Sequence, residues 1–483
     1  MDISKLASTT INRLMTIGTK NYADPLEDAE FDYTKEAVSD HFTAGFGKAV
    51  MLPDDIKSKT YYIAGYGENN PAKGVIDPQY AHALWLDDNS GKGGHLFISL
   101  DIVGLLKKDV DNLKKALNDF TATTNCRSIT VMSTHNHAGI DTMGIWGKLP
   151  RTGKSKKFMT ILFNAAITAS LAAYRDRRDG KLFYGTVEVP DMQEDIRTPE
   201  VYSKTLTRLR FVPFDGTREI YFINFASHSE SLQGCNSLVS ADFPCYLREK
   251  ILRETGAETI YGVGAIGGMI SMKIENEDQL RKENRLLEST RSIGFRLADY
   301  AMSITNEKEL KPRISYIKQE FYCIVENPVL TIACQFDLLN ADKYLLPYTN
   351  QNALKTEISY YEIDELKILM LPCELFPELA YGGYLDENQS AEGKPAKINP
   401  TPLCDICGDK DLLIFGLAND ELGYVIPPND FMLNEDSPYL DKAVDRFNRR
   451  HYEETNSMGS ETAETIAGAF TGVMQKVYAA KFR

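Results

Sequence analysis

An alternation of strand-like and helix-like segments constrains the fold of this chain more than any other feature. The apolar run at 95–103 precedes a stretch whose apolar residues are spaced four and three apart, the periodicity of an amphipathic helix. Those residues are Leu106, Val110, Leu113, Leu117 and Phe120. A second apolar, β-branched run follows at 128–134. We therefore predict a strand, helix, strand unit whose two strands lie parallel with a right-handed crossover.

Similar segments recur along the rest of the chain. Predicted strands cover 182–187, 207–212, 219–226, 258–262, 313–325, 330–336, 366–371 and 412–417. Predicted helices cover 158–175, 244–254, 279–304 and 463–478. This mixture predicts an α/β (α+β mixed) fold, a large single catalytic domain at 41–483 with mixed β-sheets flanked by helices. Residues 1–40, acidic and polar in their second half, are expected to form an N-terminal extension.

Composition limits the classes of partner. The 483 residues are 43% hydrophobic and 25% charged, which is typical of a globular chain with a substantial core. The net charge of −14 disfavours nucleic acid and anionic lipid as partners, because phosphate contacts need clustered Lys and Arg. No apolar core of signal-peptide length begins the chain, and no run reaches the roughly 18 apolar residues of a membrane helix. We expect a cytoplasmic protein with no transmembrane segment.

The eight cysteines are scattered, which is not the pattern of a disulfide scaffold. We expect most of them to be buried thiols. The role of the Cys-x-x-Cys pair Cys404 and Cys407 stays open, as does assembly into a homo-oligomer.

Two of the seven histidines, His135 and His137, stand one residue apart directly after the predicted strand 128–134. On an extended backbone, alternate residues point to the same side. Ligands in open α/β sheets gather beyond the carboxyl ends of strands, so this pair is placed where an enzyme would hold a metal. Solvated loop histidines are the alternative interpretation.

Three further strand ends repeat this arrangement. His228 follows the strand 219–226, Glu374 follows 366–371 and Tyr424 follows 412–417. These positions are much too far apart for a zinc finger, whose ligands come in close-spaced pairs. Two imidazoles and a carboxylate suit Zn²⁺ with one position left for water. Alternatively, Glu374 caps the following helix and Tyr424 is a core aromatic residue.

Several motifs resemble those of the neutral/alkaline (non-lysosomal) ceramidases, zinc amidases that cleave the N-acyl bond of ceramide. They are Ser133-Thr134-His135-Asn136-His137-Ala138-Gly139, His228 with Leu238-Val239-Ser240-Ala241-Asp242, Leu371-Pro372-Cys373-Glu374, and Gly416-Leu417-Ala418-Asn419-Asp420 leading to Gly423-Tyr424-Val425. The resemblance spans most of the chain. It implies that His135, His228, Glu374 and Tyr424 are zinc ligands and that His137 faces the substrate.

The resemblance implies a zinc-dependent hydrolase of an N-acyl bond acting on a small-molecule or lipid-like substrate, with His137 and Ser271 as catalytic residues. The family carries a Gly-Asp-Val-Ser-Pro-Asn loop with an essential serine, whereas residues 268–273 here read Gly-Met-Ile-Ser-Met-Lys and share only Gly268 and Ser271. Ser271 is expected to be either a nucleophile or an oxyanion donor. The C-terminal immunoglobulin-like domain of some members is not expected.

Three alternatives stay open at this point. One is a zinc hydrolase of another acyl, ester or sugar-derived substrate, which the changed loop at 268–273 favours. A second is a metal-binding relative without catalysis. A third is a nucleotide enzyme using the glycine-rich stretch 262–267, although no apolar helix and second strand follow it as a dinucleotide site requires.

Overall fold

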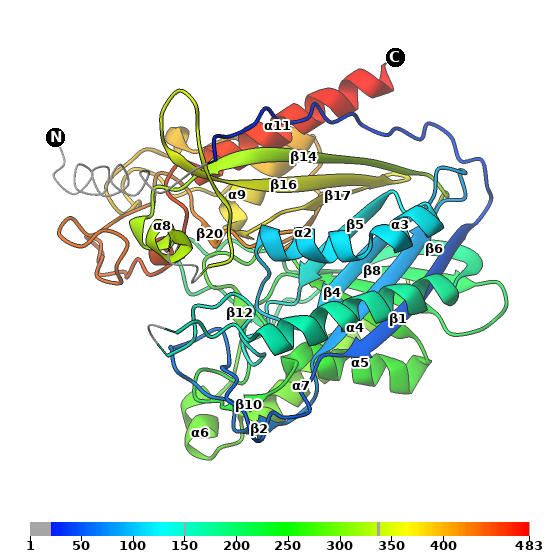
Figure 1. Cartoon of the computed structure of the whole chain (residues 1–483), viewed down its shortest axis with the longest axis horizontal. Helices are drawn as coiled ribbons and strands as arrows, with labels where there is room; N and C mark the ends of the chain where they lie inside the picture. The colour runs from blue at the N-terminus through cyan, green and yellow to red at the C-terminus, as the bar shows by residue number, and fades with distance from the viewer. Residues whose placement is uncertain (1–20, 149–150, 336–338, 483) are drawn as a thin grey trace.

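The computed structural model describes residues 21–148, 151–335 and 339–482. Within these ranges, nine strands form a large mixed sheet in the order β11-β9-β8-β6-β1-β3-β4-β5, with β13 beside β6. Their bounds are β1 Phe42–Val50, β3 Tyr80–Asp87, β4 His95–Leu100, β5 Ser128–Ser133, β6 Arg178–Glu188, β8 Thr205–Pro213, β9 Ile220–Phe225, β11 Glu258–Val263 and β13 Lys308–Leu310. Figure 1 shows this sheet running across the molecule beneath a second, smaller one.

The smaller sheet has five described strands in the order β14-β16-β17-β19, with β15 beside β16. These are β14 Ile314–Ile324, β15 Lys343–Leu345, β16 Asn352–Ile363, β17 Leu366–Met370 and β19 Leu413–Phe415. Three two-stranded ladders accompany the two sheets: β2 Gly74–Val75 with β10 Leu238–Val239, β7 Gln193–Glu194 with β12 Ser271–Met272, and β18 Glu374–Leu375 with β20 Tyr424–Val425.

The two main sheets face each other across a shared aromatic core. Phe97 of the large sheet lies 5.3 Å from Tyr361 of the small one, and Phe222 lies 4.9 Å from Phe415, measured between ring centroids. Helix α4 packs on β1 and β3, α5 packs on β11, and α11 packs on β14 and β16 (Figure 1). The described helices are α2 Lys107–Ala116, α3 Asn118–Thr124, α4 Lys156–Arg175, α5 Asp242–Thr255, α6 Glu277–Lys282, α7 Leu286–Ser303, α8 Pro328–Gln335, α9 Pro377–Tyr381, α10 Leu403–Cys407 and α11 Thr462–Lys481. Two 3-10 helices, η2 Ala396–Ile398 and η3 Glu453–Asn456, lie between them in the sequence.

The predicted mixed α/β architecture is confirmed, as is the parallel pairing of the first unit. Strands β4 and β5 run parallel with His95 opposite Ser128, and the connecting segment forms α2 and α3, which meet at Leu117. The predicted helix at 279–304 is divided into α6 and α7. Strands β1, β3 and β16 were not predicted.

One predicted strand is wrong. The segment 330–336 is helical as far as Gln335, within α8, and position 336 lies outside the described residues. The Oδ1 atom of Asn327 accepts a hydrogen bond of 3.0 Å from the Val329 backbone N–H, and Pro328 begins the helix. An Asn cap followed by proline in the first turn starts a helix, and this local signal outweighs the apolar run.

Helix α4 is the described helix whose length and hydropathy would allow it to cross a membrane. It packs on β1 and β3, and 39% of its apolar window is buried. The core helix of a globular domain meets the same criterion, so this is weak evidence for a membrane span.

Residues 21–41 have little regular structure but are tied to the domain. Phe31 is buried in the core beside Tyr360, with ring centroids 6.3 Å apart. Asp32 pairs with Lys92 at 2.7 Å and with Arg127. This part of the predicted extension therefore contributes to the core and to surface ion pairs.

The two ends of the large sheet approach each other, which brings distant strand ends together. The Ser99 hydroxyl on β4 donates a 2.6 Å hydrogen bond to the Tyr261 carbonyl on β11, although these strands lie near opposite ends of the strand order. Asn419, after β19, then links the small sheet to β5: its backbone N–H donates to the Val131 carbonyl at 2.7 Å, and its Oδ1 accepts from the Val131 N–H at 2.9 Å. The carboxyl ends of strands from both sheets thus meet in one region.

Candidate metal centre

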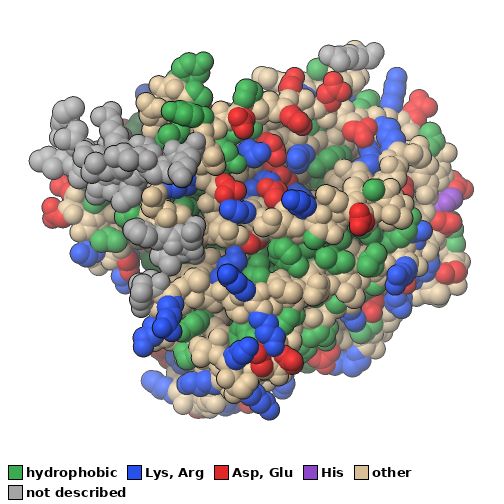
Figure 2. Space-filling model, viewed as in Figure 1, with side chains coloured by type: hydrophobic (Ala, Val, Ile, Leu, Met, Phe, Trp, Pro, Cys, Tyr) green, Lys and Arg blue, Asp and Glu red, His purple; other side chains and the backbone are tan. Residues whose placement is uncertain are grey.

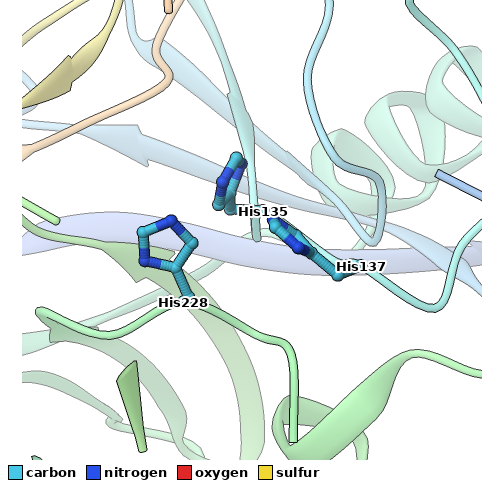
Figure 3. A group of neighbouring side chains, drawn as sticks. All are labelled: His135, His137 and His228. Atoms are coloured by element: carbon cyan, nitrogen blue, oxygen red, sulfur yellow. The ribbon is translucent and has the colours of Figure 1, made fainter. Parts of the chain in front are cut away.

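Two loops supply the histidines of this region. His135 lies two residues beyond β5 in the left-handed backbone conformation, with φ of 54°, and His228 lies three residues beyond β9. A left-handed conformation is unusual for a residue other than glycine and is found where neighbouring structure enforces it. The His137 backbone N–H donates to the Ser229 carbonyl at 2.9 Å, which fastens the two loops together. Figure 3 shows the three imidazole rings gathered around a common space.

Backbone carbonyls fix the orientation of two of these rings. The Nδ1 atom of His135 lies 2.8 Å from the Val103 carbonyl oxygen, and Nδ1 of His228 lies 2.8 Å from that of Ile270. A carbonyl only accepts, so each Nδ1 carries a hydrogen. The neutral tautomer then presents the Nε2 lone pair, which is the arrangement that metal-ligating histidines adopt.

The Glu374 carboxylate completes this group. Its Oε2 atom lies 3.0 Å from Nε2 of His228 and 3.2 Å from Nε2 of His135, and all three side chains are almost fully buried. Within the described residues, the Nε2 atom of His135 has no hydrogen bond of acceptable geometry. Adjacent donors around a tetrahedral zinc with bonds of about 2.0 to 2.1 Å lie about 3.3 Å apart, close to these separations.

The electrostatics of the group indicate a need for positive charge. Burial lowers the pKa of His228, but the hydrogen bond to Glu374 and the nearby carboxylates outweigh it and raise the pKa to about 9. Burial likewise raises the pKa of Glu374, but the adjacent His135 and His228 hold it well below its usual range. Two neutral imidazoles and a carboxylate would present only lone pairs to one another. These lone pairs repel one another, and either an added proton or a cation between them would relieve the repulsion. The donor set therefore fits a divalent metal.

His137 is the third member of the histidine group. One ligand nitrogen from each of His135, His137 and His228 lies within 4.8 Å of the others, so a three-histidine donor set is an alternative to the one with Glu374. Both ring nitrogens of His137 lack a hydrogen-bond partner among the described residues. Burial, and then the charge of His135, lower its pKa to about 3. His137 is therefore neutral near pH 7.

Glu230 joins His137 to Ser271, and sequence reasoning missed it. Its Oε2 lies 3.4 Å from Nδ1 of His137 and accepts a 2.8 Å hydrogen bond from the Tyr66 hydroxyl, while Ser271 Oγ donates to its Oε1. Ser271 also donates to the Met269 carbonyl at 3.2 Å. The only signal in the sequence was an acidic residue two positions after His228. The carboxylate of Glu230 therefore lies between Ser271 and His137 and contacts both.

Tyr424 reaches the same region but its hydroxyl has another partner. Strands β18 and β20 pair in parallel with Tyr424 opposite Glu374, and both residues line one cavity. The Tyr424 hydroxyl lies 3.1 Å from the Met269 sulfur, and burial raises its pKa well above the usual range. The histidines and Glu374 thus lie close together. The neutral phenol of Tyr424 lies in the same region, but its hydroxyl is hydrogen-bonded to the Met269 sulfur. Its role as a ligand stays a prediction.

A largely apolar cavity of about 140 Å³ opens beside Glu374. Its apolar wall comes from segments far apart in the sequence: Val103, Leu106, Met143, Ile145, Trp146, Val325, Leu330, Cys334, Leu339, Ala341, Leu354, Leu422 and Met458. His135, His137, Glu374 and Tyr424 line it as well. Another acidic residue on the wall, Glu421, was not predicted as a site residue. Burial, and then the charge of Glu374, raise the Glu421 pKa well above its usual range.

Comparison with known proteins gives a fold and no family assignment. No protein-family model matches the chain, and no curated protein matches it. Among solved structures, it is similar to the neutral ceramidase from Pseudomonas aeruginosa, with a TM-score of 0.70 and 16% identity over 91% of this chain and 75% of that one. It is also similar to a ceramidase complexed with C2, with a TM-score of 0.64 and 14% identity over 91% of this chain and 76% of that one. The chain therefore has the fold of the ceramidase structures.

Proposed function

We propose that this protein is a zinc-dependent hydrolase that cleaves an N-acyl (amide) bond, in the manner of the neutral ceramidases. The observation that carries the proposal is the position of Oε2 of Glu374, which lies 3.2 Å from Nε2 of His135 and 3.0 Å from Nε2 of His228 beside an apolar cavity. The ceramidase-like fold and the sequence motifs at these positions support it. Tyr424 is the proposed fourth ligand.

In this proposal the chain holds Zn²⁺ through His135, His228, Glu374 and Tyr424. Bound there, zinc would supply Lewis acidity for the scissile carbonyl and for water. The Val103 and Ile270 carbonyls keep the two ligating rings in the required tautomer. Tyr424 could serve as a ligand only if its hydroxyl gave up its contact with the Met269 sulfur.

The remaining polar residues would handle protons and orient the substrate. His137 is neutral. Its Nε2 has no hydrogen-bond partner among the described residues, so it would be the group that accepts a proton from water and returns it to the leaving amine. Glu230, 3.4 Å from Nδ1, would steady the ring and stabilise its protonated form. Ser271 would either donate to the developing oxyanion or act as nucleophile, and in the latter role Glu230 would take its proton. The apolar wall would receive a hydrocarbon chain.

The experiment is a substrate panel run on protein of measured metal content. Wild-type protein, the ligand variant His228→Ala and the control His41→Asn are dialysed against zinc buffers, and zinc is counted by mass spectrometry. His41 is a suitable control because it lies at the surface, with its side chain 30% exposed. Each is then given matched N-acyl amides and esters of several chain lengths, and the released amine or alcohol is measured.

We expect about one zinc per chain in the wild type and in H41N, with hydrolysis of long-chain amides, and neither zinc nor turnover in H228A. Cleavage of esters but not amides would favour another zinc hydrolase. Stoichiometric zinc without turnover of any substrate would indicate a non-catalytic relative. Absence of zinc from the wild type would overturn the proposal.

A further inference from the structure

We propose that Asp109 is a positioning residue that ties two loops together and so holds the apolar wall of the cavity in shape. This inference goes beyond the proposed function by naming a residue outside the ligand set, and its consequence for the reaction rests on that function. Asp109 lies in the first turn of α2 and is 4% exposed. Its Oδ2 atom accepts a hydrogen bond from Nζ of Lys154, and its Oδ1 atom accepts one of 2.9 Å from Nδ2 of Asn340.

The two partners of Asp109 belong to loops that supply much of the cavity wall. Lys154 lies near the end of the loop between β5 and α4, and Asn340 lies in the segment between α8 and β15. The first loop contributes Met143, Ile145 and Trp146 to the wall, and the second contributes Leu339 and Ala341.

Both loops also pack on one small apolar cluster. Leu106 precedes α2 and is buried together with Cys334 and Leu339, and this cluster packs against Met143 and Ala341. The cluster lies three residues before Asp109 in the sequence at Leu106, so α2 carries both the apolar and the polar contact with the two loops. Asp109 therefore fixes the position of each loop relative to the same helix.

The loop between β5 and α4 is braced internally, so an attachment near its end affects its apolar residues. The fully buried carboxylate of Asp141 accepts hydrogen bonds of 2.7 to 3.1 Å from the backbone N–H groups of Met143, Gly144 and Trp146. The Gly153 N–H donates to the Gly144 carbonyl at 3.1 Å, which joins the start of this loop to the residue before Lys154. A displacement at Lys154 is thus transmitted to Ile145 and Trp146.

Lys154 differs from the other basic residues of its loop. Figure 2 shows Lys and Arg side chains at the surface of the lower left part of the molecule, where this loop lies. The exposed ones in the loop and at the start of α4 are Lys148, Arg151, Lys156 and Lys157. The Lys154 side chain is only 13% exposed and is directed to Asp109.

A neighbouring ion pair joins the same segments but lies at the surface. Lys108 Nζ lies 2.6 Å from Oδ1 of Asp342, and the two side chains are 41% and 48% exposed. Exposed pairs contribute about 0 to 1 kcal/mol. Removing one member of a buried pair costs more, because the other charge is left without a counterion. The pair of Asp109 with Lys154 is therefore the one whose loss should change the wall.

The contacts that orient the proposed ligands do not involve Asp109. The rings of His135 and His228 are held by the Val103 and Ile270 carbonyls. Loss of the Asp109 contacts should therefore weaken the binding of an apolar chain and leave zinc binding unchanged. In the proposed hydrolase, this separates KM from kcat.

The test measures binding of 1-bromohexane, whose bromine quenches tryptophan fluorescence on contact. Trp146 lines the cavity, while Trp85, the second of the chain's two tryptophans, is 1% exposed and packs against Phe120 and Tyr174. The full-length protein is titrated with this probe, which has no amide bond to hydrolyse. Zinc content and the KM and kcat for an N-acyl amide are measured on the same samples.

The variants are Asp109→Ala, Lys154→Met, their double variant and Asn340→Ala. Asp111→Ala is the matched control, because Asp111 lies on the same helix and forms an exposed pair with Lys107. Lys154→Met and Asn340→Ala each remove one partner and leave Asp109 in place, so they also decide the outcome if Asp109→Ala fails to fold.

We expect D109A and K154M to bind 1-bromohexane at least about 10-fold more weakly than the wild type, N340A to be weakened as well, and D111A to be unchanged. The double variant should lose no more than D109A, because both changes break the same contact. KM should rise in parallel, with kcat and zinc content unchanged.

Wild-type affinity in both K154M and N340A, losses that multiply in the double variant, a loss of zinc from K154M, or no quenching in the wild type would overturn the inference. If the binding losses occur as expected but no protein hydrolyses an amide, the proposed function fails and the role of Asp109 in the cavity stands.

Discussion

The Oε2 atom of Glu374 lies 3.0 Å from Nε2 of His228, although the two residues are 146 positions apart and follow strands of different sheets. The same oxygen lies 3.2 Å from Nε2 of His135. One carboxylate oxygen therefore faces two imidazole nitrogens in a buried space, and the account of this protein depends on what that oxygen binds.

Replacing Glu374 by alanine should lower zinc affinity by at least about 100-fold, because it removes the only carboxylate of the proposed ligand set. Equilibrium dialysis against buffered zinc measures the change, with E362Q as the matched loss of a buried carboxylate outside the site. A zinc affinity in E374A equal to that of the wild type would mean that Glu374 is not a ligand and would favour the three-histidine set.

Replacing Glu230 by glutamine should reduce kcat/KM by roughly 10²- to 10³-fold with unchanged zinc content. Gln keeps the size of the side chain, but an uncharged amide stabilises a protonated His137 much less. Tyr66→Phe is the control, since it removes a donor to Glu230 and leaves the carboxylate in place; its loss should stay below about 10-fold. A wild-type kcat/KM in E230Q would exclude the proposed role.

Replacing Gly65 by alanine should disturb the site by steric overlap. A Cβ atom at this position would lie 2.4 Å from Cγ of His137. The backbone φ of Gly65 is +105°, a value that residues with a side chain rarely adopt. We expect a loss of about 1 to 3 kcal/mol in the free energy of unfolding, measured in urea, together with reduced hydrolysis. Gly67→Ala has nothing within 4 Å of its Cβ and should leave both unchanged. Similar behaviour of the two variants would contradict the close approach of Gly65 to His137.

Burial raises the pKa of Glu378 on α9 to about 8, which predicts a pH dependence of stability. Between pH 4.5, the ordinary pKa of a glutamic acid, and pH 8, the folded chain keeps the Glu378 proton that the unfolded chain releases. The contribution of Glu378 to the free energy of unfolding is therefore fully present below pH 4.5 and is lost as the pH rises towards 8. Glu378→Gln should therefore gain stability relative to wild type, by about 3 kcal/mol at pH 7. Urea denaturation of both proteins at pH 5 and pH 8 measures the difference in their free energies of unfolding. A difference that does not grow with pH would refute the raised pKa of Glu378.

Much of the fold was predictable because the relevant signals are local. The apolar periodicity around Val110 and the β-branched run at 128–134 each lie within one element, and both predictions were confirmed. The strand predicted at 330–336 was wrong because the Asn327 cap acts from outside that run. Strand β16 was missed although all but one of its residues are buried.

The site was only partly predictable because its decisive contacts join distant segments. Strand ends indicated His135, His228 and Glu374, and the structure brings these three together. The hydrogen bond of Tyr424 to Met269 depends on a loop whose path no spacing rule gives. Glu230 and Glu421 were missed because an acidic residue in a polar stretch is usually solvated, and only the packed structure shows that both are buried.

X-ray diffraction of zinc-soaked crystals, recorded on both sides of the zinc absorption edge, tests the central claim most directly. The account predicts one strong anomalous peak within about 2.0 to 2.3 Å of Nε2 of His135, Nε2 of His228 and a Glu374 oxygen. Absence of a peak there, with the three side chains ordered and bonded only to one another, would contradict it.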